Sequence, residues 1–386
     1  MVKFKDICTK IGSGATPKGG KEAYCEEGIS LIRSQNVLDF AFSADGLVFI
    51  NDLQAEKLKN VIVEEGDVLL NITGDSVARA CMVDKKYLPA RVNQHVCIVR
   101  ADPQKAVPSY LLYFLQLNKE YLLQLAAGGA TRNALTKEMI NNLELELPSI
   151  EDQQKISAIL DDIQARIDCN NAINENLLQQ AQALYKNRFV DLKPFDGEMP
   201  PDWRLGTVSE IIELHDSKRI PLSSRERANL AKIYPYYGAT SVMDYVDRYL
   251  FDGIYLLLGE DGTVVDSKGF PILQYVEGKF WVNNHAHIIT GKNGFTVETL
   301  YLLFSLTNVQ SIVTGAVQPK ISQGNLNKVS VVIPSEAELS AFNSIVQPIF
   351  AQIRNLRAEN DRLAATRDTL LPRLMSGELN VSSLDI

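Results

Sequence analysis

Histidine and cysteine, the residues that most often build metal and disulfide sites, are scarce in this sequence. There are four histidines and five cysteines among 386 residues, and no two cysteines form a CxxC pair. An odd number of cysteines without such spacing favours buried free thiols in a reducing compartment. We therefore expect a cytoplasmic protein without structural disulfide bonds.

Long apolar runs and an excess of basic residues are absent as well. The opening "MVKFKDICTKIGSG" lacks the apolar core of a signal peptide. The run "IYLLLG" is far shorter than the roughly 20 apolar residues that cross a membrane, so we expect no membrane partner. A net charge of −8 argues against a protein that coats nucleic acid by charge alone. It does not exclude a specific DNA binder whose basic residues gather on one face.

Two cofactor motifs are incomplete. The glycine-rich "GSGATPKGGKE" has Ala15 in place of the first P-loop glycine, and Glu22 stands where serine or threonine should follow the lysine. "MPPDW" resembles the Asp/Asn-Pro-Pro-aromatic motif of amino-methyltransferases, but Met199 and Asp202 occupy the two positions that act in that motif. We expect a structured turn near DNA phosphates for the first segment and a linker turn for the second.

A nuclease motif can also be spelled, from Pro201, Asp202, Asp216 and Lys218. Such carboxylates would hold a divalent metal, and the lysine would orient the attacking water. However, the Asp/Glu-x-Lys part recurs elsewhere in the chain, as a frequent chance match would, and no convincing pair of strands flanks it. We expect no nuclease centre here.

Two histidines, His285 and His287, alternate in a segment that reads as a strand, so both rings would point to one face. No neighbouring cysteine or carboxylate completes a metal site, and no Ser-His-Asp set or nucleophile elbow appears. We therefore predict a chain that binds no metal or cofactor and has no catalytic residues of its own.

What the sequence does contain is a tandem repeat. With a shift of 186 residues, Leu143 meets Val329 and Pro148 meets Pro334, without a gap across the surrounding segment. Further upstream, "VNQHVCI" matches "VNNHAHI", which begins at Val282. The earlier parts of the two halves diverge. The chain therefore reads as a variable globular domain followed by a helix, twice over.

Each helix carries apolar residues at heptad spacing, which is typical of coiled-coil packing. Neither helix could leave such a stripe in water, so we expect the two to pack on each other in antiparallel fashion, with a pseudo-two-fold relation between the halves. The predicted fold class is α+β: two mixed α/β domains at 1–148 and 196–334, and spacer helices at 149–195 and 335–386. The predicted packing residues are Ile156, Leu160, Ile163, Ile167, Leu177, Leu184, Phe342, Val346, Ile349, Ile353, Leu356, Leu363 and Leu370.

Both variable domains contain polar, aromatic and basic residues of the kinds that contact DNA. Arginine and lysine read guanine edges, asparagine and glutamine read adenine edges, and lysine, serine and threonine hold phosphates. The predicted DNA-contact residues are Lys18, Arg33, Ser34, Gln35, Asn36, Arg79, Arg91, Asn93, Gln94, His95, Lys218, Arg219, Tyr236, Tyr237, Thr240, Asn283, Asn284, His285, Gln318 and Lys320.

This arrangement resembles the specificity subunit of type I restriction–modification systems over essentially the whole chain. The resemblance rests on "IGSGATP…ISLIRSQNV", on "GGATRNALTKEMINNLELELPSIEDQQKISAIL" and on its repeat "GAVQPKISQGNLNKVSVVIPSEAELSAF". It rests also on "YPYYGATSVMDYVDRYLFDG" in the second half. The segment "EAELSAF" departs from the family, which usually has Glu-Gln followed by a basic residue there.

The resemblance implies two target recognition domains, each reading half of a bipartite sequence in double-stranded DNA. It also implies helices that dock two methyltransferase subunits and, with them, restriction/translocase subunits. S-adenosylmethionine, ATP and Mg²⁺ would then belong to the partner subunits and not to this chain. Two alternatives stay open: a specificity module with its own nuclease or methyltransferase activity, and a two-headed adaptor for proteins or glycans.

Overall fold

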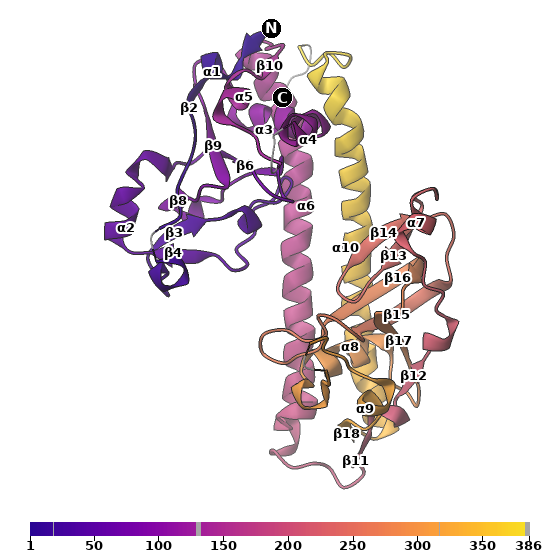
Figure 1. Ribbon diagram of the computed structural model, residues 1–386. Helices are drawn as coiled ribbons and strands as arrows, with labels where there is room; N and C mark the ends of the chain where they lie inside the picture. Colours follow the sequence, from indigo (N-terminus) through magenta and orange to yellow (C-terminus); the bar gives the residue numbers. More distant parts are fainter. Residues whose placement is uncertain (18, 129–132, 316, 383–386) are drawn as a thin grey trace. The chain divides into compact units, whose positions relative to one another are not determined.

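The chain divides into two compact units, which are described separately. The computed structural model describes residues 1–17, 19–128, 133–315 and 317–382. Unit 1 consists of Met1–Asp168 and Asn360–Ile386, and unit 2 consists of Cys169–Glu359. Each unit combines a globular part with portions of the two long helices, α6 (Ile150–Tyr185) and α10 (Glu336–Met375) (Figure 1).

Unit 1 contains two four-stranded sheets and a short two-stranded ladder. The first sheet has the order β2 (Cys8–Ser13), β9 (Val96–Ala101), β6 (Val68–Asn71) and β7 (Ala80–Met82). The second has the order β4 (Val48–Ile50), β3 (Ile29–Ile32), β8 (Ala90–Val92) and β5 (Ile62–Val63). The ladder joins β1 (Val2–Lys3) to β10 (Glu144–Leu145). The helices are α1 (Phe4–Ile7), α2 (Asp52–Lys57), α3 (Pro108–Leu117), α4 (Lys119–Ala127) and α5 (Lys137–Asn141).

The core of unit 1 forms where α3 covers the first sheet. Strand β6 is buried along its whole length, as its continuous apolar run "VLL" requires. Pro108 starts α3, where its missing N–H costs no hydrogen bond. Tyr110, Leu111 and Tyr113 of this helix then lie fully inside the core.

Unit 2 is built on one six-stranded sheet. Its order is β12 (Ile212–Leu214), β17 (Ala286–Gly291), β15 (Phe251–Gly259), β16 (Leu273–Val282), β13 (Tyr234–Tyr237) and β14 (Val242–Val246). A two-stranded ladder joins β11 (Arg204–Thr207) to β18 (Ser330–Ile333). The helices are α7 (Ser224–Arg227), α8 (Val297–Ser305) and α9 (Gln323–Asn327).

The internal repeat predicted from the sequence is present in the fold. The neighbours β2–β9–β6 of unit 1 correspond to β12–β17–β15 of unit 2, and each unit has one two-stranded ladder. The short helices before these ladders also begin alike. Thr136 caps α5 by accepting a hydrogen bond from the Met139 N–H, and Ser322 caps α9 by accepting one from the Asn325 N–H. The predicted fold class is therefore confirmed.

The long helices pack on each other within each unit. In unit 1 the first part of α6 places Ile156 and Leu160 in one buried cluster with Leu371 of α10. In unit 2 the last part of α6 places Tyr185 in a cluster with Phe342 near the start of α10. The two helices therefore run antiparallel.

No helix in the described ranges has the length and apolar character needed to cross a membrane.

One predicted packing residue is wrong. Leu184 is 42% exposed, and the buried positions near this end of α6 are Ala181 and Tyr185. An α-helix with 3.6 residues per turn drifts by about 20° per heptad from a strict seven-residue repeat, so the buried stripe shifts along a long helix. Beyond Tyr185 the chain continues as one π-helical turn over Lys186–Val190, which places Phe189 in the same cluster.

The other predicted packing residues differ in burial. Six of them are buried, and these are Ile156, Leu160, Phe342, Val346, Ile353 and Leu356. Six are partly buried, and these are Ile163, Ile167, Leu177, Ile349, Leu363 and Leu370.

Candidate nucleic-acid interface

The repeated motif Val-Asn-x-His forms the same turn in both units. In unit 1 it joins β8 to β9, and the Asn93 Oδ1 accepts a hydrogen bond from the His95 N–H at 3.0 Å. In unit 2 it joins β16 to β17, and the Asn283 Oδ1 accepts from the His285 N–H at 2.8 Å. An asparagine that bonds the backbone two residues on is a common way to stabilise a turn. We refer to these two segments as the Asn-x-His turns.

In unit 1 the Asn-x-His turn is tied to two other segments. The Ile72 N–H donates to the His95 carbonyl at 2.9 Å, and the Leu135 N–H donates to the Ile72 carbonyl at 2.8 Å. The His95 Nδ1 lies 2.5 Å from the Thr73 Oγ1. The turn, the end of β6 and the segment before α5 therefore meet at one place.

Unit 2 repeats these contacts with different side chains. The Glu260 N–H donates to the His285 carbonyl, and the Ile321 N–H donates to the Glu260 carbonyl, both at 2.8 Å. The His285 Nδ1 pairs with Asp261. Ile72 and Glu260 are thus equivalent positions, as are Thr73 and Asp261.

A surface cavity of about 590 Å³ lies beside the turn of unit 1. Among its lining residues are four predicted DNA-contact residues: Ser34, Gln35, Arg79 and His95. Within the described part of the chain, the Arg79 guanidinium has no hydrogen-bond or ion-pair partner. The cavity therefore presents a cation and several polar groups to solvent.

The glycine-rich segment near the N-terminus packs on the same turn. The Gly14 N–H donates to the Asn93 carbonyl at 3.1 Å. A Cβ at Gly14 would lie 1.7 Å from the Val92 carbonyl oxygen, so only glycine fits this approach. Thr16 then donates to the exposed side chain of Gln94. Lys18, a predicted DNA-contact residue, lies outside the described residues.

Three predicted DNA-contact residues of unit 1 are buried and make hydrogen bonds within the chain. The Asn36 side chain accepts from the Arg33 N–H at 3.0 Å and donates to the Ser43 carbonyl at 2.9 Å, so it shapes a loop. The Arg91 guanidinium donates to the backbone carbonyls of Ala55 in α2 and Ala90 in β8. Asn93 is buried by its own turn. Arg33 is half-buried, with its guanidinium 5.5 Å from the centre of the Tyr24 ring.

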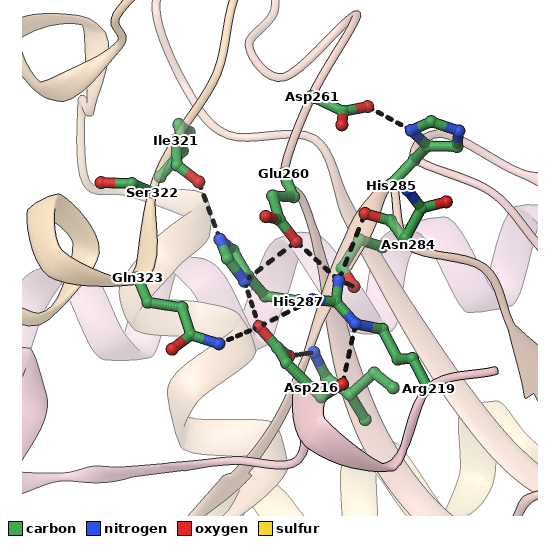
Figure 2. A network of polar contacts seen from close by, with 12 residues as sticks. Asp216, Arg219, Glu260, Asp261, Asn284, His285, His287, Ile321, Ser322 and Gln323 are labelled. Carbon is green, nitrogen blue, oxygen red and sulfur yellow. Dashed lines mark hydrogen bonds and ion pairs between the residues drawn. The ribbon is translucent and has the colours of Figure 1, made fainter. Parts of the chain in front are cut away.

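Behind the turn of unit 2 lies a buried network of charged side chains, which Figure 2 shows. The His287 Nδ1 lies 2.6 Å from the Asp216 Oδ2, and the His287 Nε2 lies 2.8 Å from the Ile321 carbonyl oxygen. The second Asp216 oxygen accepts from the Ile288 N–H at 2.9 Å. The His287 side chain is completely buried.

Arg219 connects this network to the turn. Its Nη1 donates to the Glu260 Oε2 at 2.6 Å, to the Ala286 carbonyl at 2.8 Å and to the Asn284 carbonyl at 3.3 Å (Figure 2). The opposite oxygen of Glu260 lies 3.2 Å from the Lys320 Nζ. One carboxylate therefore holds two cations from segments far apart in the sequence.

The carboxylates of the network are held in their ionised form. Burial raises the pKa of Asp216, whereas hydrogen bonds from His287, Ile288 and Gln323 and the charge of His287 lower it. The lowering effects together outweigh burial, so the net pKa lies below the ordinary value. Burial likewise raises the pKa of Glu260, and Arg219 together with the charge of His287 brings the net value below the ordinary one. Both groups are therefore anionic near neutral pH.

The network has the composition of a metal site but not free ligand atoms. Ligand atoms of Asp216, Glu260 and His287 all lie within 4.8 Å of one another. However, both nitrogens of His287 face acceptors, and both Glu260 oxygens face cationic side chains. A metal would have to displace these partners, so the residues fit an internally paired charge network better than a metal centre.

Three predicted DNA-contact residues of unit 2 are likewise engaged within the chain. Tyr236 and Asn283 are buried, and the Tyr236 hydroxyl accepts from the Leu222 N–H at 2.9 Å. The Arg219 side chain is only 13% exposed and is occupied by the network. Tyr237 is half-buried, with its ring against Phe280. The exposed members of the predicted set are Lys218, Thr240, Asn284, Gln318 and Lys320, with His285 partly exposed.

Sequence reasoning missed Glu260 and the role of His287. It expected no carboxylate near the two histidines, which is wrong, because the sheet brings Asp216 and Glu260 to His287 from distant segments. Asp216 follows β12 and His287 lies near the start of β17, and both are buried, where an unpaired charge would be costly.

Comparison with known proteins agrees with this architecture. The family model for the type I restriction modification DNA specificity domain matches twice, at residues 1–179 and 200–364. The chain therefore belongs to this family and contains two copies of its domain.

Individual relatives extend over nearly the whole chain. The type I restriction enzyme MjaIX specificity subunit of Methanocaldococcus jannaschii is 26% identical over 99% of this chain and 94% of its own length. The HindI specificity subunit of Haemophilus influenzae is 22% identical over 91% of this chain and 94% of its own length. A crystal structure of a type I system S subunit from M. genitalium has the same fold, with a TM-score of 0.55 at 16% identity, covering 97% of this chain and 95% of that one.

Proposed function

We propose that this chain is the specificity subunit of a type I restriction–modification complex, in which each unit reads one half of a bipartite DNA target. The observation that carries the proposal is the Asn-x-His turn, which occurs once per unit with the same backbone contacts and different exposed neighbours. Gln94 and Arg79 in unit 1, and Asn284 and Lys320 in unit 2, are side chains of the types that read adenine and guanine edges or hold phosphates.

The chain would act through partner subunits. With a net charge of −8 it supplies little of the phosphate neutralisation on which DNA affinity depends. Two methyltransferase subunits docked on α6 and α10 would provide that charge, together with S-adenosylmethionine and the chemistry on the base. Restriction/translocase subunits would add ATP and Mg²⁺. A DNA target of this kind also places the complex in the cytoplasm.

The absence of an own active site is part of the proposal. The carboxylates that could form a nuclease centre are Asp202, which is exposed, and Asp216, which is bound to His287. Such a pair does not offer the two free carboxylates that a metal-dependent nuclease needs. This favours a specificity role over a fused nuclease.

The test is a domain exchange in the assembled complex. Residues 1–148 are replaced by the equivalent domain of a relative, and the methylated sequence is mapped before and after. We expect one half of the target to change and the other to stay. A change in both halves would contradict independent reading, and methylation or cleavage by the purified chain alone would favour the alternative of a module with its own activity. Loss of binding to duplex DNA in the presence of the methyltransferase subunits, at low and at physiological salt, would favour the non-DNA adaptor.

A further inference from the structure

The charged network of unit 2 has no counterpart in unit 1. Glu260 corresponds to Ile72, because the backbone N–H of each donates to the histidine carbonyl of the turn in its unit. The backbone carbonyl of each accepts a hydrogen bond from an equivalent downstream segment of the same unit. His287 corresponds to Cys97, because each lies two residues after the histidine of its turn. Ile72 and Cys97 are both buried. The same fold is therefore built in unit 1 with uncharged side chains at these positions.

This difference means that the fold itself does not require the charges. Replacing a buried ion pair by apolar residues is often neutral or stabilising, because two ions no longer have to leave water. A buried network at a position where the sister unit does without it therefore points to a role other than stability.

Both ring nitrogens of His287 are hydrogen-bonded in this network. The Ile321 carbonyl can only accept a hydrogen bond, so the His287 Nε2 donates to it. The Nδ1 lies 2.6 Å from Asp216 and 3.7 Å from Glu260. Glu260 in turn pairs with the cations Arg219 and Lys320.

Each arm of the network ends at an exposed group of the candidate interface. Through Arg219 it fixes the backbone of Asn284. Through Glu260 it holds the Lys320 ammonium, whose side chain is 47% exposed. The His287 Nε2 also anchors the backbone carbonyl of Ile321, the residue that follows Lys320. A flexible lysine and a surface turn are in this way held in one arrangement, which lowers the entropy lost on binding.

We propose that His287 is a positioning residue of the second half-site: through hydrogen bonds at both ring nitrogens it holds Asn284, His285 and Lys320 in the arrangement that reads DNA. This inference rests on the proposed function and adds to it a difference between the two units. The first half-site is read without such a network, because its positions hold Ile72 and Cys97.

Three substitutions separate the two hydrogen bonds of the His287 ring. In His287→Asn the amide nitrogen can replace the Nδ1 donor to Asp216, and in His287→Gln it can replace the Nε2 donor to the Ile321 carbonyl. His287→Cys introduces the residue of unit 1 and removes both strong donors. The matched control is His215→Gln, a buried histidine of the same unit whose Nε2 bonds the Thr290 hydroxyl outside the network.

The assay uses the chain assembled with its methyltransferase subunits. The probe is the duplex whose bipartite sequence is obtained by mapping methylation in cells that express the complex, together with duplexes carrying one changed base pair in either half. A wrong base pair costs roughly 5- to 150-fold in affinity for specific DNA-binding proteins. We define discrimination as the ratio of the affinity for the correct duplex to that for a duplex with one changed base pair. We expect His287→Cys to lower this ratio for the second half to within a few-fold of one and to leave the ratio for the first half unchanged. His287→Asn and His287→Gln should give intermediate ratios, and His215→Gln the wild-type ratio.

The outcomes separate the two proposals. If the wild-type complex discriminates at neither half, the proposed function fails. The positioning role is tested if the wild-type complex discriminates at both halves. It is refuted if His287 variants that fold like the wild type keep full discrimination at the second half, or lose discrimination equally at both halves. Folding is followed by the fluorescence of the chain's two tryptophans, Trp203 and Trp281, which both lie in unit 2. If His287→Cys does not fold, the asparagine and glutamine variants decide.

Discussion

Truncating Phe342 should destabilise unit 2 strongly, because this residue fixes the start of α10 to the end of α6. Phe342 is 1% exposed. Its ring meets Tyr185 at 5.7 Å and Phe189 at 4.8 Å between centroids, both edge to face. Phe→Ala substitutions in cores cost about 3–5 kcal/mol, and a loss of that size fits a residue with two aromatic partners.

The two tryptophans make this prediction measurable in the whole chain. Trp203 packs on Phe189 at 5.5 Å, and Trp281 is buried in the sheet, so their fluorescence follows unit 2 alone. With a urea dependence of about 1–3 kcal/mol per molar, a loss of about 3–5 kcal/mol lowers the unfolding midpoint by at least about 1 M. The matched control is Ile345→Ala, three residues along the same helix and 46% exposed, which should change the stability by at most about 1 kcal/mol. A Phe342→Ala midpoint no lower than that of the control would refute the packing described for unit 2.

Three further predictions concern charge, thiols and base reading. The pKa of Asp216 in the folded chain lies below its ordinary value of 3.8, so the stability that this carboxylate contributes is present above about pH 4 and is lost as the pH falls through the lower folded value. In acid titrations followed by tryptophan fluorescence, Asp216→Asn should therefore be less stable than the wild type at neutral pH and lose less stability on acidification. Equal acid sensitivity of both proteins would contradict this. Burial raises the pKa of Cys97 to about 12, whereas Cys25 and Cys169 are exposed, so a thiol reagent should modify Cys25 and Cys169 first in the native chain, and early labelling of Cys97 in a peptide map would speak against the described core. Arg79→Ala should lower discrimination at the first half-site by about 1–3 kcal/mol in binding assays of the complex without shifting the urea midpoint, and unchanged discrimination would remove Arg79 from the interface.

Much of the fold could be predicted because its signals are local. The heptad stripes of the two long helices and the repeat around Pro148 and Pro334 are visible in sequence. The error at Leu184 arose from the same signal, since a strict heptad count ignores the drift of a real helix. The division of the strands into two four-stranded sheets in unit 1 and one six-stranded sheet in unit 2 depends on long-range pairing, which periodicity does not encode.

The repeat of Val-Asn-x-His was visible in the sequence, but the local structure of the motif was not. The segment around His285 reads as a strand, whereas the structure forms a turn in which Asn93 and Asn283 bond inward and the residue after each is exposed. Burial of a side chain depends on what the rest of the sheet packs against it. The pairing of Glu260 with His287 could not be predicted for the same reason, because His287 lies in a strand distant in the sequence.

Methylome sequencing is the decisive measurement for the proposal that each unit of this chain reads one half of a DNA target. The chain is expressed with its methyltransferase subunits in cells that lack other adenine methylation, and methylated positions are mapped across the genome. We expect a single motif made of two defined parts separated by a fixed stretch of undefined bases, and this motif should disappear when the chain is omitted. A motif that persists without the chain, or one contiguous sequence unaffected by exchange of either unit, would contradict it.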